Sequence, residues 1–198
     1  MVARHFRVMA VILATLALPA CQDVKPPMQK LPAISFANQR PINLDVGQLE
    51  IVPEYQAPGR SPNIEHLMPV SPEGAAIRWA QDRLKPVGTT GFARVTIKNA
   101  KVVSVPLKTD KGVAGLFKTE QEERYDAALD VSVEILDQRH LPIGSDVVAR
   151  SSRSRTVPEG MTINERDRVL YEISESLAKD IDQQLEQLIK TYLARWVK

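Results

Sequence analysis

The sequence predicts an α/β protein of the α+β type: a two-layer sandwich in which a mostly antiparallel sheet of about four strands carries two helices. Strict alternation of apolar and polar residues over 91–107 and 125–135 is typical of strands with one buried face. Apolar residues at helical spacing over 72–85, and over the longer segment 164–197, predict two helices. The order strand, helix, three strands, long helix favours two layers around one core.

Four strands are predicted, over residues 44–55, 91–107, 125–135 and 146–157. The second is interrupted by polar residues at 98–101, which suits a bulge or a turn into a separate short strand. The fourth is much more polar than the others, since it contains three arginines among three serines. That composition is unlike a central strand.

Both predicted helices begin with a capping signal. Ser71 can accept from the first helical amides, and Pro72 suits the first helical position. Trp79 is interpreted as a core residue rather than a ligand platform. Thr162-Ile163-Asn164-Glu165 matches a capping box at the start of the long helix. That helix would measure about 50 Å, whereas strands usually span about 20 Å, so we expect it to overhang the sheet or to break.

The first twenty residues have the pattern of a secretory signal peptide. Arg4 and Arg7 precede an apolar run over 8–18, which is too short to cross a bilayer core of about 30 Å. The run leads into Leu18-Pro19-Ala20-Cys21, which resembles the lipobox of bacterial lipoproteins. This resemblance implies that residues 1–20 are removed and that Cys21 carries a diacylglycerol anchor with further acylation such as palmitate. The alternative is a secreted chain cut elsewhere, with Cys21 as a free thiol.

The resemblance also implies a location in the cell envelope. In enterobacterial lipoproteins an aspartate after the cysteine favours the inner membrane, and Gln22 stands there in this chain. We therefore expect the outer membrane, with the domain facing the periplasm. The order of elements resembles that of small outer-membrane lipoproteins of Gram-negative bacteria, which include a lipopolysaccharide-assembly lipoprotein inside its barrel partner and auxiliary lipoproteins of lipid transport. No diagnostic motif supports this second resemblance.

After the signal, residues 21–43 are rich in proline and are predicted to form an extended tether. Residues 44–198 are predicted to form one domain. The chain has 26 basic and 24 acidic residues, and removal of residues 1–20, with their two arginines and no acid, makes the counts equal. This balance argues against nucleic acid as a partner. Because Cys21 is the only cysteine, no disulfide is expected to stabilise the domain.

The residues needed for catalysis are scarce, and we expect no enzymatic activity. His66 and His140 fall in predicted loops, and neither has a second ligand at metal-binding spacing. No nucleophile elbow or phosphate-binding glycine loop is present in the sequence. The sequence therefore predicts no cofactor and no metal site.

Two groups of residues are candidates for binding. Arg150, Arg153 and Arg155 lie on the fourth strand, where the last two share a face and could bind an anion through paired guanidinium groups. The alternative is an edge strand kept from pairing by its charges. Partner binding is also predicted for the apolar end of the long helix, where an alternative is that the end folds back onto its own domain. Its candidate residues are Leu188, Tyr192 and Trp196.

These observations favour a lipid-anchored, non-enzymatic envelope protein that acts as an accessory or assembly subunit through protein contacts. Its expected partners are the membrane, through the acylated N-terminus, and an envelope protein. The alternative function is a periplasmic lipid or glycolipid carrier. A carrier would need a continuous apolar cavity between the sheet and the helices.

Overall fold

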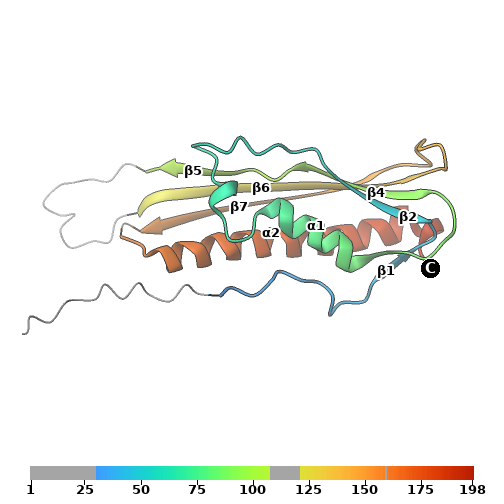
Figure 1. Cartoon of the computed structure of the whole chain (residues 1–198), viewed down its shortest axis with the longest axis horizontal. Helices are drawn as coiled ribbons and strands as arrows, with labels where there is room; N and C mark the ends of the chain where they lie inside the picture. Colours follow the sequence, from blue (N-terminus) through green and yellow to red (C-terminus); the bar gives the residue numbers. More distant parts are fainter. Residues whose placement is uncertain (1–29, 108–120, 159) are drawn as a thin grey trace, which may run out of the picture.

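The computed structural model describes residues 30–107, 121–158 and 160–198, and it has the predicted α+β architecture (Figure 1). Two helices cover one face of a five-stranded mixed sheet, and a two-stranded parallel sheet lies beside it. The sheet contains β2 (Gln48–Pro53), β4 (Phe92–Asn99), β5 (Val102–Pro106), β6 (Gln121–Leu136) and β7 (Val147–Pro158). The other elements are β1 (Ile42–Leu44), β3 (Leu84–Pro86), the helices α1 (Pro72–Arg83) and α2 (Ile163–Tyr192), and two short 3-10 turns, Glu65–Leu67 and Ala194–Trp196.

The strand β6 is the centre of the sheet. On one side it pairs antiparallel with β4 along its second half and with β5 along its first half. On the other side it pairs antiparallel with β7 over residues 121–133. The predicted interruption at 98–101 is the junction of β4 and β5, where the register shifts between Ile97 and Asn99. Only the pairing of β2 with β4 is parallel within this sheet.

The expectation that the long helix overhangs the sheet is wrong. The strand β6 has 16 residues, which at about 3.3 Å per residue span about 50 Å. The helix α2 has 30 residues and spans about 45 Å at 1.5 Å per residue. The sheet is therefore as long as the helix, because its two longest strands greatly exceed the usual strand length (Figure 1).

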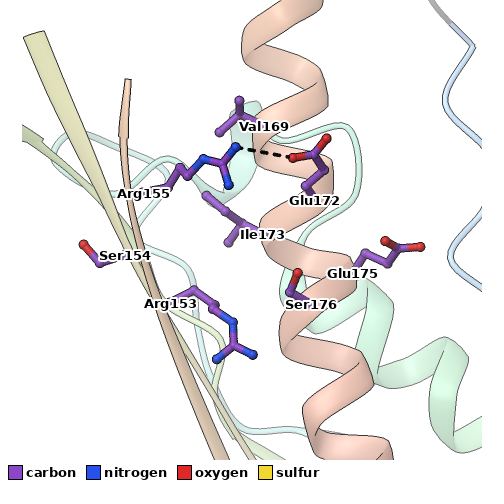
Figure 2. Close-up of a pocket in the computed structure, with 8 residues that line it drawn as sticks. All are labelled: Arg153, Ser154, Arg155, Val169, Glu172, Ile173, Glu175 and Ser176. Carbon is purple, nitrogen blue, oxygen red and sulfur yellow. Dashed lines mark ion pairs between the residues drawn. The ribbon is translucent and has the colours of Figure 1, made fainter. Parts of the chain in front are cut away.

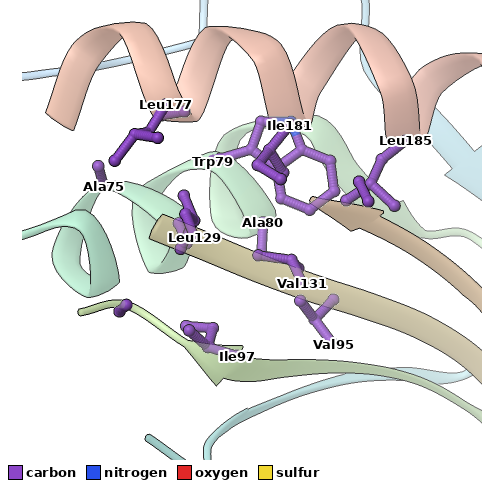
Figure 3. Packing of buried hydrophobic residues seen from close by; sticks show 14 of the residues in the cluster. Ala75, Trp79, Ala80, Val95, Ile97, Leu129, Val131, Leu177, Ile181 and Leu185 are labelled. Carbon is purple, nitrogen blue, oxygen red and sulfur yellow. The ribbon is translucent and has the colours of Figure 1, made fainter. Parts of the chain in front are cut away.

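Both helices begin as the sequence predicts. Ser71 Oγ accepts from the Gly74 N–H at 3.1 Å, and Thr162 with Glu165 forms the capping box of α2. The space between the helices and the sheet is filled by apolar side chains, and Trp79 is fully buried there, as predicted (Figure 3). Contributors from the helices and the sheet include Ala75, Ala80, Leu177, Ile181 and Leu185 on the helices and Val95, Ile97, Leu129 and Val131 on the strands.

One buried ion pair joins the two helices inside this core. Arg83 Nε lies 2.7 Å from Asp182 Oδ1, which also accepts from the Trp79 indole N–H at 2.8 Å. The same guanidinium contacts Glu186 and donates to the backbone oxygen of Arg40. Because each buried charge has partners, the cluster fixes how α1, α2 and the N-terminal segment meet.

The predicted tether needs correction over its second half. Ile34, Phe36 and Ile42 are buried in the core, and Asp82 Oδ2 on α1 accepts from Ser35 Oγ and from the Phe36 N–H, both at 2.8 Å. The segment then enters β1, which pairs with β3. Its prolines exclude regular structure but leave the apolar side chains between them free to pack. The first half of the predicted tether, up to residue 29, lies outside the described residues.

The predicted first strand, residues 44–55, begins at the last residue of β1 and contains β2. A turn over residues 45–47 separates β1 from β2, and the two strands belong to different sheets. The turn packs closely on the chain after β3. A Cβ atom at Gly88 would lie 2.6 Å from the backbone carbonyl carbon of Asp45, so this crossing requires glycine.

Candidate interaction surface at the edge of the sheet

The backbone of Arg150 shows which side of β7 is free. Its N–H donates to Gln184 Oε1 on α2 at 3.3 Å, and its carbonyl accepts from Gln184 Nε2 at 3.1 Å. Backbone groups alternate in direction along a strand, so those of Ser152, Ser154 and Thr156 point to the same side. Within the described ranges, no strand pairs with that side of β7. We call the outer side of β7 over residues 152–156 the open edge.

A groove runs beside the open edge, between β7 and α2 (Figure 2). It consists of two adjoining pockets of about 420 and 450 Å³, which share Arg155, Val169 and Glu172. Its apolar surface comes from Pro158, Met161, Val169 and Ile173, and the rest is lined by Gly160 and by arginine, glutamate and serine side chains. We call it the β7–α2 groove. It is a shallow surface feature with mixed chemistry rather than a closed apolar cavity.

The structure brings only two of the three candidate arginines together. Arg153 and Arg155 lie on the face of β7 toward α2 (Figure 2). Arg150, an odd number of residues away from both, is on the opposite face. The three guanidinium groups each lie beside a carboxylate: Arg150 near Asp130 at 3.8 Å, Arg155 near Glu172 at 3.8 Å, and Arg153 in contact with Asp180. Neighbouring acids thus offset these cations, and anion binding by them stays a prediction.

The strand β7 is also an edge strand, as the alternative interpretation of the arginines requires. Its charged side chains, however, are directed toward carboxylates on β6 and α2. The residues whose backbone faces outward at the open edge are Ser152, Ser154 and Thr156, which carry no charge. Over residues 152–156 the edge therefore lacks the lysine, proline or bulge that commonly protects such strands, and Arg153 and Arg155 are its only charged side chains.

The other candidate surface, the end of α2, mostly packs on its own domain. Leu188 and Trp196 contact the core, and the Trp196 carbonyl accepts from the Asp45 N–H at 2.7 Å. Tyr192 is 66% exposed. The structure thus gives Leu188 and Trp196 the folded-back arrangement that was the alternative. Partner binding at Tyr192 stays a prediction.

The outer side of β5 is covered by the chain itself. The Ile64 N–H donates to the Val102 carbonyl at 3.0 Å, and the Ser104 N–H donates to the Pro62 carbonyl at 2.9 Å. Asn63 forms an antiparallel bridge to β5. We call this outer side of β5, with residues 62–65 lying along it, the closed edge.

The carboxylate of Glu65 stabilises the closed edge through hydrogen bonds. Glu65 is only 5% exposed, and its Oε1 atom accepts from Tyr55 Oη at 2.7 Å, from the Val102 N–H at 2.8 Å and from Asn63 Nδ2 at 2.9 Å. Its Oε2 atom is buried without a hydrogen-bond partner in the described part of the chain. Sequence reasoning did not identify this cluster, since its members are separated by loops and strands.

Burial and the hydrogen bonds act on the Glu65 carboxyl in opposite directions. Burial raises its pKa, but the donors Asn63, the Val102 N–H and Tyr55 outweigh burial and hold the pKa below the ordinary value of 4.5. Burial, together with the hydrogen bond to Glu65, raises the pKa of the Tyr55 phenol. Glu65 is therefore a charged carboxylate at neutral pH, and Tyr55 is its neutral donor.

Other predicted features are placed as follows. His140 lies in a loop, where Nε2 is 2.9 Å from Glu50 Oε1, and His66 lies in the short turn 65–67. Among the residues that the structure describes, no cluster of three or more metal-ligating side chains is present. No helix in this part of the chain is long and apolar enough to cross a membrane. Cys21 lies outside the described residues.

No protein-family model matches the chain, and no curated protein matches its sequence. Among solved structures, a minor lipoprotein from Acinetobacter baumannii is similar, with 12% identity and a TM-score of 0.42 over 77% of this chain and 96% of that chain. Rare lipoprotein B from Shewanella oneidensis has 10% identity and a TM-score of 0.39 over 75% and 98%. Both are named as lipoproteins. In this chain, residues 18–21 resemble the lipobox of that class. At these TM-scores the likeness carries no argument about function or partners.

Proposed function

We propose that this chain is a lipid-anchored, non-enzymatic protein of the cell envelope that acts as an accessory or assembly subunit through protein contacts. The open edge is the observation that supports this proposal. It presents the outward backbone groups of three residues, and among the described residues only the Ser152 carbonyl has a hydrogen-bond partner there, Arg153 Nη1 at 2.9 Å. Next to it, α2 holds the strand from one side through Gln184. An exposed strand edge is a template for pairing with another chain.

The anchor limits where such contacts can occur. In this proposal Cys21 carries diacylglycerol and palmitate, and the domain lies on the periplasmic side of the outer membrane. Ile34 is already buried in the domain, so the linking chain is roughly a dozen residues and reaches at most about 40 Å. The partner therefore lies at or close to the membrane surface.

The alternative function, a lipid or glycolipid carrier, is favoured by no observation. The layer between sheet and helices is filled by Trp79, Leu129, Ile181 and their neighbours (Figure 3). The two pockets of the β7–α2 groove lie outside that layer and are lined by arginine and glutamate together with apolar and serine side chains. A carrier would need the helices to separate from the sheet before it could enclose an acyl chain.

Site-specific photo-crosslinking in the envelope tests the proposed contacts. When the full-length chain carries a photoreactive residue at Thr156, on the open edge, it should form one discrete adduct with a partner protein. The same residue at Lys101, which is exposed near the closed edge, should not. Equal adducts at both positions, or none at either, would contradict an accessory role that uses the open edge.

The anchor has its own test. Cys21→Ser should abolish labelling by a radioactive fatty acid and release the protein from the membrane fraction or leave it uncleaved. The adduct at Thr156 should weaken in this variant, because the chain is no longer held near the membrane. Fatty-acid labelling that persists in Cys21→Ser would show that the lipobox assignment is wrong.

A further inference from the structure

We propose that the partner adds an extended, acidic β-strand to the open edge of β7. This inference rests on the proposed function, since it assumes a protein partner, and it assigns the shape and charge of the segment that binds. The segment would pair with residues 152–156 and extend the sheet by one strand.

The backbone sets the shape of the ligand. The outward N–H and C=O groups of Ser152, Ser154 and Thr156 recur at every second residue, which only an extended chain can match. Gln184 shows the chemistry that fits, because its side-chain amide gives Arg150 one acceptor and one donor, as a neighbouring strand would. A helix presents no comparable row of backbone groups.

Charge sets the composition of the ligand. The strand β7 contains three arginines and no acid over residues 147–158. On β6 the residues opposite Arg153 and Arg155 are Ala127 and Tyr125, so neither arginine has a carboxylate across the inner side of the ladder. Their carboxylate partners, Asp180 and Glu172, come from α2, but the two arginine side chains are still 42% and 58% exposed. Opposite charges directly across a strand pair stabilise it, so acidic residues fit there.

The same charges argue against a second copy of this chain as the partner. In a two-fold pairing of β7 with β7 centred on Ser154, Arg153 of one copy would lie opposite Arg155 of the other. Like charges in directly opposed positions destabilise a strand pair. The charges of the edge therefore disfavour this pairing of two copies.

A peptide probe tests the inference directly. The peptide is acetyl-(Val-Glu)3-Val-amide, and one matched control replaces its glutamates by lysines while another carries N-methyl groups on its valines. With the full acylated chain in detergent micelles, the glutamate peptide should slow hydrogen exchange at the amides of Ser152, Ser154 and Thr156. Neither control peptide should do so. Equal protection by the lysine peptide, protection elsewhere only, or no protection would overturn the inference.

Two substitutions at Ser154 distinguish the contribution of its backbone N–H to peptide binding from that of its side chain. Ser154→Ala and Ser154→Pro both remove the hydrogen bond from Ser154 Oγ to Asp126, but only proline removes the outward N–H. The glutamate peptide should bind Ser154→Pro at least about fivefold more weakly than Ser154→Ala. Equal binding by the two folded variants would contradict strand addition. If Ser154→Pro does not fold, the N-methylated peptide on the unsubstituted chain tests the same bonds.

Failure of this inference is distinguishable from failure of the proposed function. If the crosslink from Thr156 to the envelope partner persists unchanged in Ser154→Pro, the partner binds here without strand pairing. The proposed function then stands and the strand inference is wrong. Loss of the adduct in Ser154→Pro and its retention in Ser154→Ala support both.

Discussion

The outer side of β5 and the outer side of β7 lie on opposite borders of the same sheet, and they differ in how other segments of the described chain cover them. The closed edge is covered by residues 62–65 and fastened by the buried carboxylate of Glu65. Beside the open edge the Gln184 side chain pairs with the backbone of Arg150, and on the open edge the Ser152 carbonyl accepts from Arg153 Nη1 at 2.9 Å. The contrast teaches that this fold can cover a strand edge within its own chain, and that it leaves β7 available.

The two edges also differ in what stabilises them. Three donors converge on one oxygen of Glu65, which is nearly inaccessible to water. Beside the open edge, the contacts between β7 and α2 involve partly exposed groups, such as Asp180 with Ser151 and Arg153. Substitutions at the closed edge should therefore cost much more stability than substitutions at the open edge.

The largest effect is expected for Glu65→Ala. It leaves the Val102 N–H, Tyr55 Oη and Asn63 Nδ2 without their acceptor in a buried place, and we expect a loss of about 3 kcal/mol in the free energy of unfolding. Urea denaturation followed by circular dichroism measures it. Ser154→Ala, at the open edge, serves as the control and should cost less than about 1 kcal/mol. Equal losses in the two variants would show that the two edges do not differ in how much they contribute to the free energy of unfolding.

A smaller and pH-dependent effect is expected for Glu65→Gln. The amide would place N–H donors at the buried Oε2 position, which has no partner among the described residues, and it would remove the charge. We expect the free energy of unfolding to fall by about 2 kcal/mol at neutral pH. The pKa of Glu65 is lower in the folded protein than the ordinary 4.5. Its charge therefore contributes stability that is fully present above about pH 4.5 and is lost as the pH falls through the folded pKa.

The difference between the wild type and Glu65→Gln should consequently shrink below pH 4.5. Denaturant melts from pH 7 downward measure this difference. Gln184→Ala removes no ionisable group, so its stability relative to the wild type should change little over the same range. A Glu65→Gln difference that grows in acid would mean that the carboxyl is protonated in the folded protein.

An intermediate effect is expected for Asp180→Ala. This change removes the acceptor of Ser151 Oγ, at 2.6 Å, and the ion-pair partner of Arg153, and should cost about 1 kcal/mol because the pair is partly exposed. It also frees Arg153, so the glutamate peptide should bind more tightly. Glu175→Ala is the matched control, since it removes a groove carboxylate that pairs with Lys179. Unchanged peptide binding in Asp180→Ala would show that Arg153 does not contribute to the open edge.

Much of the fold could be predicted because its signals are local. The alternation over 91–107 and 125–135, the capping residues Ser71 and Thr162, and the helical spacing of α2 each depend on neighbours in the sequence. The length of β6 could not be predicted in this way, since its first residues, 121–124, are polar and lack the alternation. They are held as a strand by pairing with β5 and β7, which no local pattern encodes.

The candidate surfaces were predictable only in part, for the same reason. Arg153 and Arg155 were identified as sharing a face, because period two fixes that. Their acidic neighbours could not be foreseen, since Asp180 and Glu172 come from α2. Glu65 gave no signal at all, because its contact with Val102 joins residues 37 positions apart. Exposed apolar residues at the end of α2 were overestimated, since the folded chain covers most of them.

The smallest effect is expected for Gln184→Ala, which extends the open edge. The side chain of Gln184 occupies both backbone groups of Arg150, at 3.1 and 3.3 Å, in an exposed position. Its removal should cost only about 0.5 kcal/mol, because water replaces both hydrogen bonds. The Arg150 amide should exchange faster, and the edge available to a peptide should lengthen from residues 152–156 to 150–156. Hydrogen exchange measures both effects, with the exposed neighbour Gln183→Ala as the control. Unchanged exchange at Arg150 in Gln184→Ala would show that a group other than Gln184 protects this amide. The part of β7 that differs from the closed edge would then be residues 152–156 alone.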